Sequence, residues 1–287
     1  AAGCAGFSRS SGAGFAAAME NCHKGWERRK RGIPAQQLKD FMGEIQGMET
    51  WQGFARKDFV FSGHSCILVY PQAFAQGKPW VWRAEFFGAF AQVDEEMLRR
   101  GYAVAYCSLS DRYGCPSAVE DMARFHEYMV HERGFAQKAI LFGFSRGGLY
   151  AVNFALAHPD CVASLYLDAP VLDIRSWPGR RLKDGSARPE WAQCLACYGL
   201  QEADMASFVP APIARAGELA QNGIEVALVA GLEDSVVPYA ENGARFAEPF
   251  LQAGGTLFIA LKPHCDHHPH SLENPEPIAR FLDKTAR

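Results

Sequence analysis

The sequence lacks any apolar run that approaches the ~20 residues that a transmembrane helix needs, so we expect no membrane span. It also lacks an excess of charge of one sign. The formal net charge is -3 at pH 7 over 287 residues, which gives no reason to expect nucleic acid or an anionic membrane surface as a partner. Internal repeats are absent as well. What remains is typical of a globular protein, with 48% hydrophobic and 21% charged residues and enough length for one large α/β domain.

The cysteines form no recognisable pairing pattern. Nine are present, an odd number, and they are scattered along the chain. Free cysteines in apolar segments behave as small hydrophobic residues, so this pattern favours a reducing compartment and hence a cytoplasmic location. The string from Cys194 to Cys197 is a C-x-x-C without the second pair that a zinc site of this type needs, and a redox dithiol is the alternative interpretation.

The first 20 residues are rich in alanine, glycine and serine and begin without methionine. We expect residues 1–20 to be a disordered, targeting or upstream segment. The hydrophobic core of a signal peptide is not visible there. Export would therefore require that this segment be the remnant of a processed signal, and the location is left open. The mixture of basic and apolar residues at 21–50 predicts one or two amphipathic helices.

Short β-rich runs then alternate with helical patterns. Apart from a strand and helix around residue 145, the patterns predict strands within 59–70 and at 80–84, 102–106, 162–167, 224–230 and 256–261, and helices at 93–100, 118–131, 240–253 and 277–284. This alternation predicts a mainly parallel sheet flanked by helices, in one domain that spans residues 21–287. A stretch rich in proline and glycine at about 174–223 interrupts the alternation, and we expect it to form a cap or lid.

The stretch from Ala139 to Tyr150 carries the clearest chemical signal. A short apolar run, typical of a buried strand, is followed by Gly143-x-Ser145-x-Gly147 and then by a helix rich in alanine and leucine. A serine on such a strand-to-helix turn has a strained backbone and an exposed hydroxyl, and the flanking glycines avoid collisions of a Cβ with the neighbouring strand and helix. The pattern predicts that Ser145 is a nucleophile, and the alternative is a structural glycine-rich turn.

A serine hydroxyl needs a base, and the base needs a carboxylate that orients it. Asp234 follows the predicted strand 224–230, at the carboxyl end where open α/β sheets place their sites. The strand-to-helix turn at Ser145 is called the elbow below. Asp168 and Asp173 follow the next strand after it and are the alternative acids, although we expect them to cap the start of the inserted stretch at about 174–223. The strand 256–261 runs into a loop with four histidines, His264, His267, His268 and His270. The order serine, aspartate, histidine is the one expected of an α/β-hydrolase.

From Trp80 to the C-terminus the sequence resembles α/β-hydrolase-fold serine hydrolases, and more narrowly a group of bacterial esterase-like hydrolases. The resemblance is carried by six strings: Pro79-Trp-Val-Trp-Arg83, Glu85-Phe-Phe-Gly88, Gly143-Phe-Ser-Arg-Gly-Gly-Leu149, Asp168-Ala-Pro170, Ser176-Trp-Pro-Gly179 and His267-His-Pro-His-Ser-Leu272. The elbow string is generic to the superfamily, whereas the others are specific. The resemblance implies an α/β-hydrolase fold and a hydrolase activity, and we expect no cofactor.

The resemblance also implies which histidine is the base. His267 occupies the position that follows a G-x-G string in related chains, where this sequence has His264-Cys265-Asp266. His268 is the next candidate, and the other histidines are expected to brace the loop. A metal site is a further interpretation, because suitable ligands stand close together: His264, Asp266, His267, His268 and His270. Ligands this close along one loop rarely converge on one tetrahedral ion, so we expect no metal.

The oxyanion hole is expected to use backbone N–H groups. One is that of Arg146, and the second comes from the turn after the strand 80–84, at Glu85 or Phe86. The side chain of Arg146 has two interpretations. Either it contacts the oxyanion or a substrate carboxylate, as in the similar G-x-S-R-x-G string of glucuronoyl esterases, or it pairs with an acid such as Glu85 and supports the elbow.

Further side chains are candidates for substrate binding, because aromatic faces and guanidinium groups suit sugar rings and uronate carboxylates. These candidates are Trp82, Arg83, Arg175, Trp177 and His268. For the tryptophans, a place in the hydrophobic core is the alternative.

Together the patterns predict a serine hydrolase that cleaves a carboxylic ester through an acyl-enzyme, with Ser145, His267 and Asp234 as its triad. The expected substrate is a small-molecule or carbohydrate ester, such as an acetyl ester or the methyl ester of a uronate. The alternatives are a prolyl-oligopeptidase-like serine peptidase and a non-catalytic binding protein with a hydrolase fold. The first normally carries a propeller gate, for which the first 60 residues are too short, and the second usually lacks a triad residue. The oligomeric state is left open.

Overall fold

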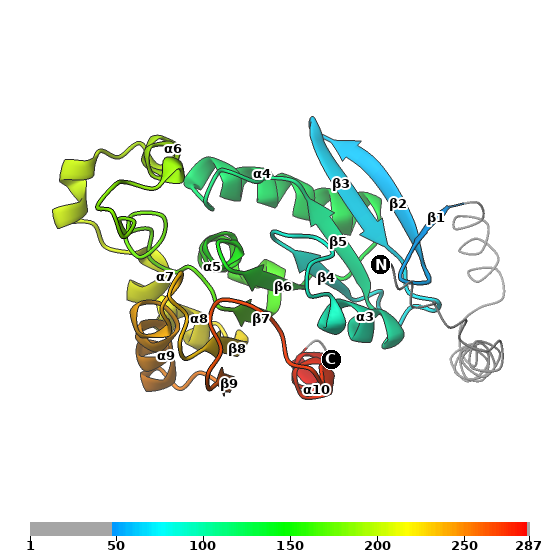
Figure 1. The fold of residues 1–287 in the computed structure, drawn as a ribbon. Helices are drawn as coiled ribbons and strands as arrows, with labels where there is room; N and C mark the ends of the chain where they lie inside the picture. The colour runs from blue at the N-terminus through cyan, green and yellow to red at the C-terminus, as the bar shows by residue number, and fades with distance from the viewer. Residues whose placement is uncertain (1–47, 286–287) are drawn as a thin grey trace, which may run out of the picture. The chain divides into compact units, whose positions relative to one another are not determined.

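A nine-stranded sheet forms the centre of the computed structural model, which describes residues 48–285. Its strands are β1 (Glu49–Trp51), β2 (Phe54–Phe61), β3 (His64–Val69), β4 (Trp80–Arg83), β5 (Ala103–Cys107), β6 (Ala139–Phe144), β7 (Val162–Asp168), β8 (Glu225–Gly231) and β9 (Leu257–Lys262). Their order across the sheet is β1-β2-β3-β5-β4-β6-β7-β8-β9 (Figure 1). The interpretations of residues 1–20 and 21–47 lie outside the described residues.

The sheet is mainly parallel, as predicted. Every neighbouring pair from β5 to β9 is parallel, whereas the pairs β1–β2, β2–β3 and β3–β5 are antiparallel. Strands β2 and β3 form a hairpin in which Phe61 pairs with His64. Its turn residues Ser62 and Gly63 both have positive φ, of 49° and 81°, which matches the twist of a two-residue hairpin. The pattern at 59–70 predicted strands there but missed the first residues of β2, and the separate pattern at 21–50 predicted a helix where β1 begins.

Helices cover the sheet between the strands. They are α3 (Gln92–Arg99), α4 (Pro116–Glu127), α5 (Gly147–Ala157), α8 (Ala216–Gln221), α9 (Gly243–Gln252) and α10 (Glu276–Thr285). Helices α3 and α10 lie side by side, while α4 contacts α5, α5 contacts α8 and α8 contacts α9 (Figure 1). These two groups are the helical layers that a parallel sheet requires. Within residues 48–285, no helix combines the length and the apolar character needed to cross a bilayer.

The strand that leads to the candidate nucleophile is buried at every position. In β6, Ile140, Phe142 and Phe144 pack with Val93 of α3 and Ile278 of α10 in one hydrophobic cluster. Because side chains alternate between the faces of a strand, the intervening residues turn to the opposite face. Burial on both faces explains why this run is apolar throughout rather than alternating.

The chain between β7 and β8 contains the segment that we expected to be a lid. It forms α6 (Pro189–Tyr198), a 3-10 turn (Glu202–Ala206) and α7 (Ala211–Ala214) before α8. In one hydrophobic cluster, Trp191 and Leu195 of α6 pack with Leu149 of α5 and with Val237. Helix α7 contacts α5 and α9, so this last part of the segment is integrated with the helical layer. A lid function for the remainder stays a prediction.

A buried ion pair fixes the turn after β4. Arg83 is fully buried, and its Nη1 donates to Asp94 Oδ2 at 2.8 Å. Its Nη2 donates to the carbonyl oxygens of Phe86, at 3.1 Å, and Ala89, and its guanidinium lies 3.9 Å from the centre of the Phe144 ring. Burial raises the pKa of Asp94 to about 6, so the carboxyl group is ionised and paired at neutral pH. The buried arginine thereby connects β4, the turn at 86–89 and α3.

We expect Asp94→Asn to lower the free energy of unfolding by about 3–5 kcal/mol, because a neutral amide leaves the buried Arg83 charge without its counter-charge. Urea denaturation at about pH 8, above the Asp94 pKa, measures the change. The matched control is Asp58→Asn, which removes an exposed ion pair with Arg56 and should change stability by no more than about 0.5 kcal/mol. Equal losses for the two variants would contradict the proposed role of the buried pair.

Candidate active site

Ser145 lies in a strained turn between β6 and α5. Its φ is +47°, a conformation that is uncommon for a residue with a Cβ and that is expected at a nucleophile elbow. The turn is held from both sides: the Ser145 N–H donates to Asp168 O at 2.9 Å, and the Ser145 carbonyl accepts from the N–H groups of Gly148, at 3.0 Å, and Val171, at 2.8 Å. The sheet and the following loop therefore impose the strain on this residue.

The glycines around Ser145 allow this close approach. A Cβ on Gly143 would lie 2.9 Å from the Gly147 carbonyl oxygen and 3.0 Å from the Cβ of Ala151. A Cβ on Gly148 would lie 2.6 Å from the Cβ of Pro170. Distances this short require the backbone to shift, so these positions of the G-x-S-x-G-G string admit no side chain without distortion.

Three side chains form a hydrogen-bonded series at the ends of β6, β8 and β9. The Ser145 hydroxyl lies 2.9 Å from Nε2 of His267, and Nδ1 of His267 lies 2.8 Å from Oδ2 of Asp234. Both the imidazole and the carboxylate are buried. With Nδ1–H donating to Asp234, Nε2 accepts from the serine hydroxyl. This is the arrangement in which an imidazole can remove the serine proton.

The loop after β8 fixes the Asp234 carboxylate. Its Oδ1 accepts the N–H groups of Val236, at 2.9 Å, and Val237, at 2.7 Å, which leaves Oδ2 for the histidine. Asp266, which precedes His267 in the sequence, links the loop after β8 to the loop after β9. Its Oδ1 accepts the N–H groups of Ser235 and His267, each at 2.8 Å. The hydrogen bond from the Ser235 N–H has the largest effect on the pKa of Asp266, and together with that from the His267 N–H it lowers this pKa. A short polar network thus holds the acid and the imidazole in register.

The string that replaces G-x-G before His267 adopts a conformation typical of glycine. His264 has a φ of +55°, and its Nδ1 lies 2.8 Å from Oε1 of Glu233. The chain approaches Gly231 closely at this point, since a Cβ there would lie 2.3 Å from Cys265 O. His264 therefore takes a backbone conformation that glycine adopts more readily, at a point where two chain segments approach closely.

The expected oxyanion donors lie on two turns. Phe86 follows β4 with a φ of +55°, and Arg146 precedes the first turn of α5. Within residues 48–285, the N–H groups of Phe86 and Arg146 donate no hydrogen bond to another protein atom. Their part in an oxyanion hole stays a prediction, as does that of Glu85.

The side chain of Arg146 forms ion pairs. Its Nη1 donates to Asp111 at 2.7 Å and its Nη2 donates to Glu85 Oε2 at 3.3 Å, while Ser110 donates to the same oxygen at 3.1 Å. Burial raises the pKa of Glu85, and the charge of Arg146 opposes that rise. The geometry therefore favours the interpretation in which Arg146 pairs with an acid and supports the elbow.

Two of the expected substrate-binding residues are buried in the core. Trp82 is 1% exposed, and its ring packs against the rings of Trp80, Phe125 and Phe154. Arg83 is 0% exposed and is occupied by Asp94. The prediction that Trp82 and Arg83 line the site is therefore wrong. Parallel strands are buried on both faces, so even the charged end of β4 points into the core.

The remaining three substrate-binding candidates have partners within the chain. Arg175 pairs with Asp173 at 2.7 Å, and the ring of Trp177 is 6.1 Å from that of Tyr113. His268 is exposed and stacks on Phe90 with 5.4 Å between the ring centres. Substrate contact by Arg175, Trp177 or His268 stays a prediction.

Sequence reasoning missed a second histidine–aspartate pair. Nδ1 of His270 lies 2.8 Å from Oδ1 of Asp168, whose Oδ2 accepts the Ser271 N–H and the Tyr166 hydroxyl, each at 2.7 Å. The Asp168 carboxylate therefore does not orient His267, and it does not cap the start of the insertion, which is the role that we had expected for it. Its backbone carbonyl also accepts the Ser145 N–H, so one residue braces both the elbow and the histidine loop. The two partners are 102 residues apart, and no local pattern connects them.

The surroundings of the C-x-x-C string disfavour ionisation of its two thiols, Cys194 and Cys197. Burial raises the pKa of Cys194 to about 12, which disfavours the thiolate that redox chemistry requires. Seven cysteines lie within residues 48–285, and all of them are free thiols. The redox interpretation is therefore not supported.

Comparisons with known proteins agree with the fold. Residues 101–193, which include the elbow, match a family model described as alpha/beta hydrolase fold. No curated protein matches the sequence. Fold and comparison together define the class: the chain has the α/β-hydrolase fold.

Solved structures of this fold include peptidases and a phospholipase. A puromycin-hydrolyzing peptidase of Mycobacterium tuberculosis is 16% identical, with a TM-score of 0.59 over 80% of this chain and 38% of that one. Dipeptidyl peptidase 4 of Porphyromonas gingivalis is 14% identical, with a TM-score of 0.60 over 80% and 35%. A membrane phospholipase A, described as a bacterial virulence factor, is 17% identical, with a TM-score of 0.51 over 94% and 97%. The chain spans little more than a third of the two peptidases, and the likeness is one of fold.

Proposed function

We propose that this protein is a serine hydrolase that acts on carboxylic esters. The proposal depends on one observation above all, the hydrogen-bonded series Ser145–His267–Asp234 at the carboxyl ends of three strands. A hydroxyl, an imidazole and a buried carboxylate in this order can perform acyl transfer without a cofactor. The strained backbone of Ser145 supports the same conclusion.

In the first half-reaction the Ser145 hydroxyl attacks the ester carbonyl while Nε2 of His267 takes its proton. Asp234 keeps the imidazole in the correct tautomer and stabilises the imidazolium. The N–H groups of Arg146 and Phe86 stabilise the negative oxygen of the tetrahedral intermediate. His267 then protonates the leaving alcohol and an acyl-enzyme remains. In the second half-reaction His267 takes a proton from a water molecule, which attacks the acyl carbonyl. The bond to Ser145 then breaks, the serine oxygen regains a proton from His267, and the carboxylic acid leaves.

The structure gives less support for a particular alcohol in the substrate than for the ester bond itself. The expectation of a carbohydrate came from side chains that suit sugars and uronates, but Trp82 and Arg83 are buried in the core. Arg146 is occupied by Glu85 and Asp111. Acetylated sugars and methyl uronates therefore remain substrates to test alongside simple esters.

A serine peptidase is the second candidate. The observation in its favour is the similarity in fold to two peptidases, with TM-scores of 0.59 and 0.60. The same triad chemistry cleaves amides, provided that the leaving amine is protonated. A non-catalytic binding protein is disfavoured because nucleophile, base and acid are all in hydrogen-bonding contact.

A substrate panel tests the proposal against the second candidate. We expect kcat/KM for p-nitrophenyl acetate to exceed that for prolyl and aminoacyl arylamides by at least about 100-fold. The panel also contains acetylated sugars and methyl uronates, and the Ser145→Ala variant supplies the background rate. Arylamide hydrolysis that matches or exceeds ester hydrolysis, and that is lost in Ser145→Ala, would replace the esterase proposal with the peptidase.

A further inference from the structure

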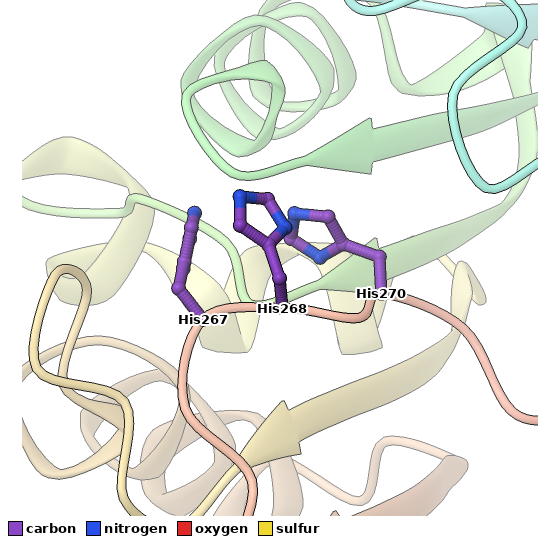
Figure 2. Close-up of side chains that lie close together, drawn as sticks. All are labelled: His267, His268 and His270. Atoms are coloured by element: carbon purple, nitrogen blue, oxygen red, sulfur yellow. The ribbon is translucent and has the colours of Figure 1, made fainter. Parts of the chain in front are cut away.

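Three imidazoles gather on the loop after β9. The side chains of His267, His268 and His270 rise from the same side of this loop, as Figure 2 shows. One nitrogen of each ring lies within 4.8 Å of the corresponding nitrogens of the other two. The rings are also mutually close, with 4.9–5.0 Å between their centres. Three of the five possible ligands on this loop are therefore close neighbours, although the sequence led us to expect no metal site here.

Two of the three rings are already oriented as metal-binding histidines usually are. Nδ1 of His267 is hydrogen-bonded to Asp234, and Nδ1 of His270 is hydrogen-bonded to Asp168, each at 2.8 Å. A carboxylate on one ring nitrogen fixes the tautomer and leaves the lone pair of the other nitrogen for a metal ion. Both carboxylates are buried, so this orientation is preorganised. The nitrogen that His267 and His270 can offer is therefore Nε2.

The third candidate ligand, His268, lies on the solvent side of the other two. His268 is exposed, and within residues 48–285 its ring nitrogens form no hydrogen bond, so ring contacts with Phe90, His267 and His270 hold the side chain in place. In a tetrahedral zinc site with Zn–N distances of about 2.0–2.1 Å, the nitrogens are about 3.3 Å apart. The three nitrogens lie within 4.8 Å of one another, so binding requires side-chain movement, which is easiest for the exposed His268 ring. Its exposure also gives an ion a path from solvent.

We propose that His267, His268 and His270 form a binding site for a divalent ion of the zinc class, with water as the fourth ligand, and that this ion inhibits the enzyme. Three imidazoles suit borderline transition-metal ions and not magnesium or calcium. An ion on Nε2 of His267 occupies the lone pair that must accept the Ser145 proton. Binding and proton abstraction therefore exclude each other, and the ion is a reversible inhibitor. The inhibition, unlike the binding, rests on the proposed function.

Metal binding is measured first, on a protein that needs no activity. Cobalt(II) and zinc(II) are titrated into the Ser145→Ala variant. We expect one tetrahedral ion per chain, visible as the d–d absorption bands of cobalt, with a dissociation constant of about 10 µM or less for zinc. His268→Ala in the same background should weaken binding at least about 10-fold. His264→Ala is the matched control, because His264 is 90% exposed on the same loop but lies outside the cluster, and it should leave the affinity unchanged.

Inhibition is measured second, on the enzyme with Ser145 intact. Zinc should inhibit p-nitrophenyl acetate hydrolysis reversibly, and EDTA should restore the activity. His268→Ala should raise the inhibition constant for zinc at least about 10-fold above that of the wild-type protein, with the inhibition of each protein measured against its own metal-free rate. Equal zinc affinity in Ser145→Ala with and without His268→Ala, or a sulfur-to-cobalt charge-transfer band, would overturn the site. Binding without inhibition of an active enzyme would overturn the regulatory part. An inactive wild-type protein that still binds the ion would refute the proposed function and leave the site standing.

Discussion

Ser145→Ala is expected to lower kcat/KM for ester hydrolysis by at least about 10⁴-fold, because the variant lacks the nucleophile and retains only the binding and oxyanion contributions. Alanine removes one hydroxyl from a residue whose backbone is held by Asp168, Gly148 and Val171. The fold should therefore be unaffected, and the melting temperature should stay close to that of wild type. Steady-state kinetics of the two proteins, with thermal unfolding alongside, provide the measurement.

Ser117→Ala serves as the control for this comparison. Ser117 is an exposed serine on α4, where its hydroxyl accepts a hydrogen bond from Arg112. Its replacement should leave kcat/KM within about threefold of wild type. If Ser145→Ala instead kept more than about 1% of the activity, the acyl-enzyme mechanism would be untenable.

The second large effect separates the clustered histidines. We expect His267→Ala to lower kcat by at least about 10³-fold, because among residues 48–285 no other side chain is hydrogen-bonded to both Ser145 and Asp234. His268→Ala should cost no more than about 10-fold, since His268 contacts neither of these partners. Kinetics of both variants with p-nitrophenyl acetate test the assignment.

Folding must be checked for both histidine variants, because His267 is buried and His268 is exposed. Circular dichroism and thermal unfolding separate a lost base from a lost structure. A result in which only His268→Ala is inactive, with both variants folded, would transfer the role of base to His268.

The sequence predicted the sheet and the elbow well because both depend on local patterns. Apolar runs of strand length, alternating with helical periodicity, sufficed for β4 to β9. The order of Ser145, Asp234 and the histidine loop placed three groups at strand ends, and strand ends of a parallel sheet meet at one edge. The choice of His267 came from the resemblance alone, since four histidines share that loop.

The errors concern partners that are distant in the sequence. The sequence suggested that Arg83 lines a pocket, but in the structure it pairs with Asp94 in the core. It also suggested that Trp82 binds a sugar ring, but Trp82 packs against other aromatic rings in the core. The pair of Asp168 with His270 has the same character. Polar groups can be buried only when they are paired, so their location depends on tertiary contacts that no local pattern encodes.

Labelling by a fluorophosphonate, followed by tryptic mapping, tests the central proposal most directly. Cleavage after Lys138 and Arg146 releases Ala139–Arg146, a peptide in which Ser145 is the only serine. We predict one covalent adduct per chain, located on this peptide and abolished in Ser145→Ala and strongly reduced in His267→Ala. Absence of labelling in the folded wild-type protein, or an adduct on any other peptide, would contradict the assignment of Ser145 as the nucleophile.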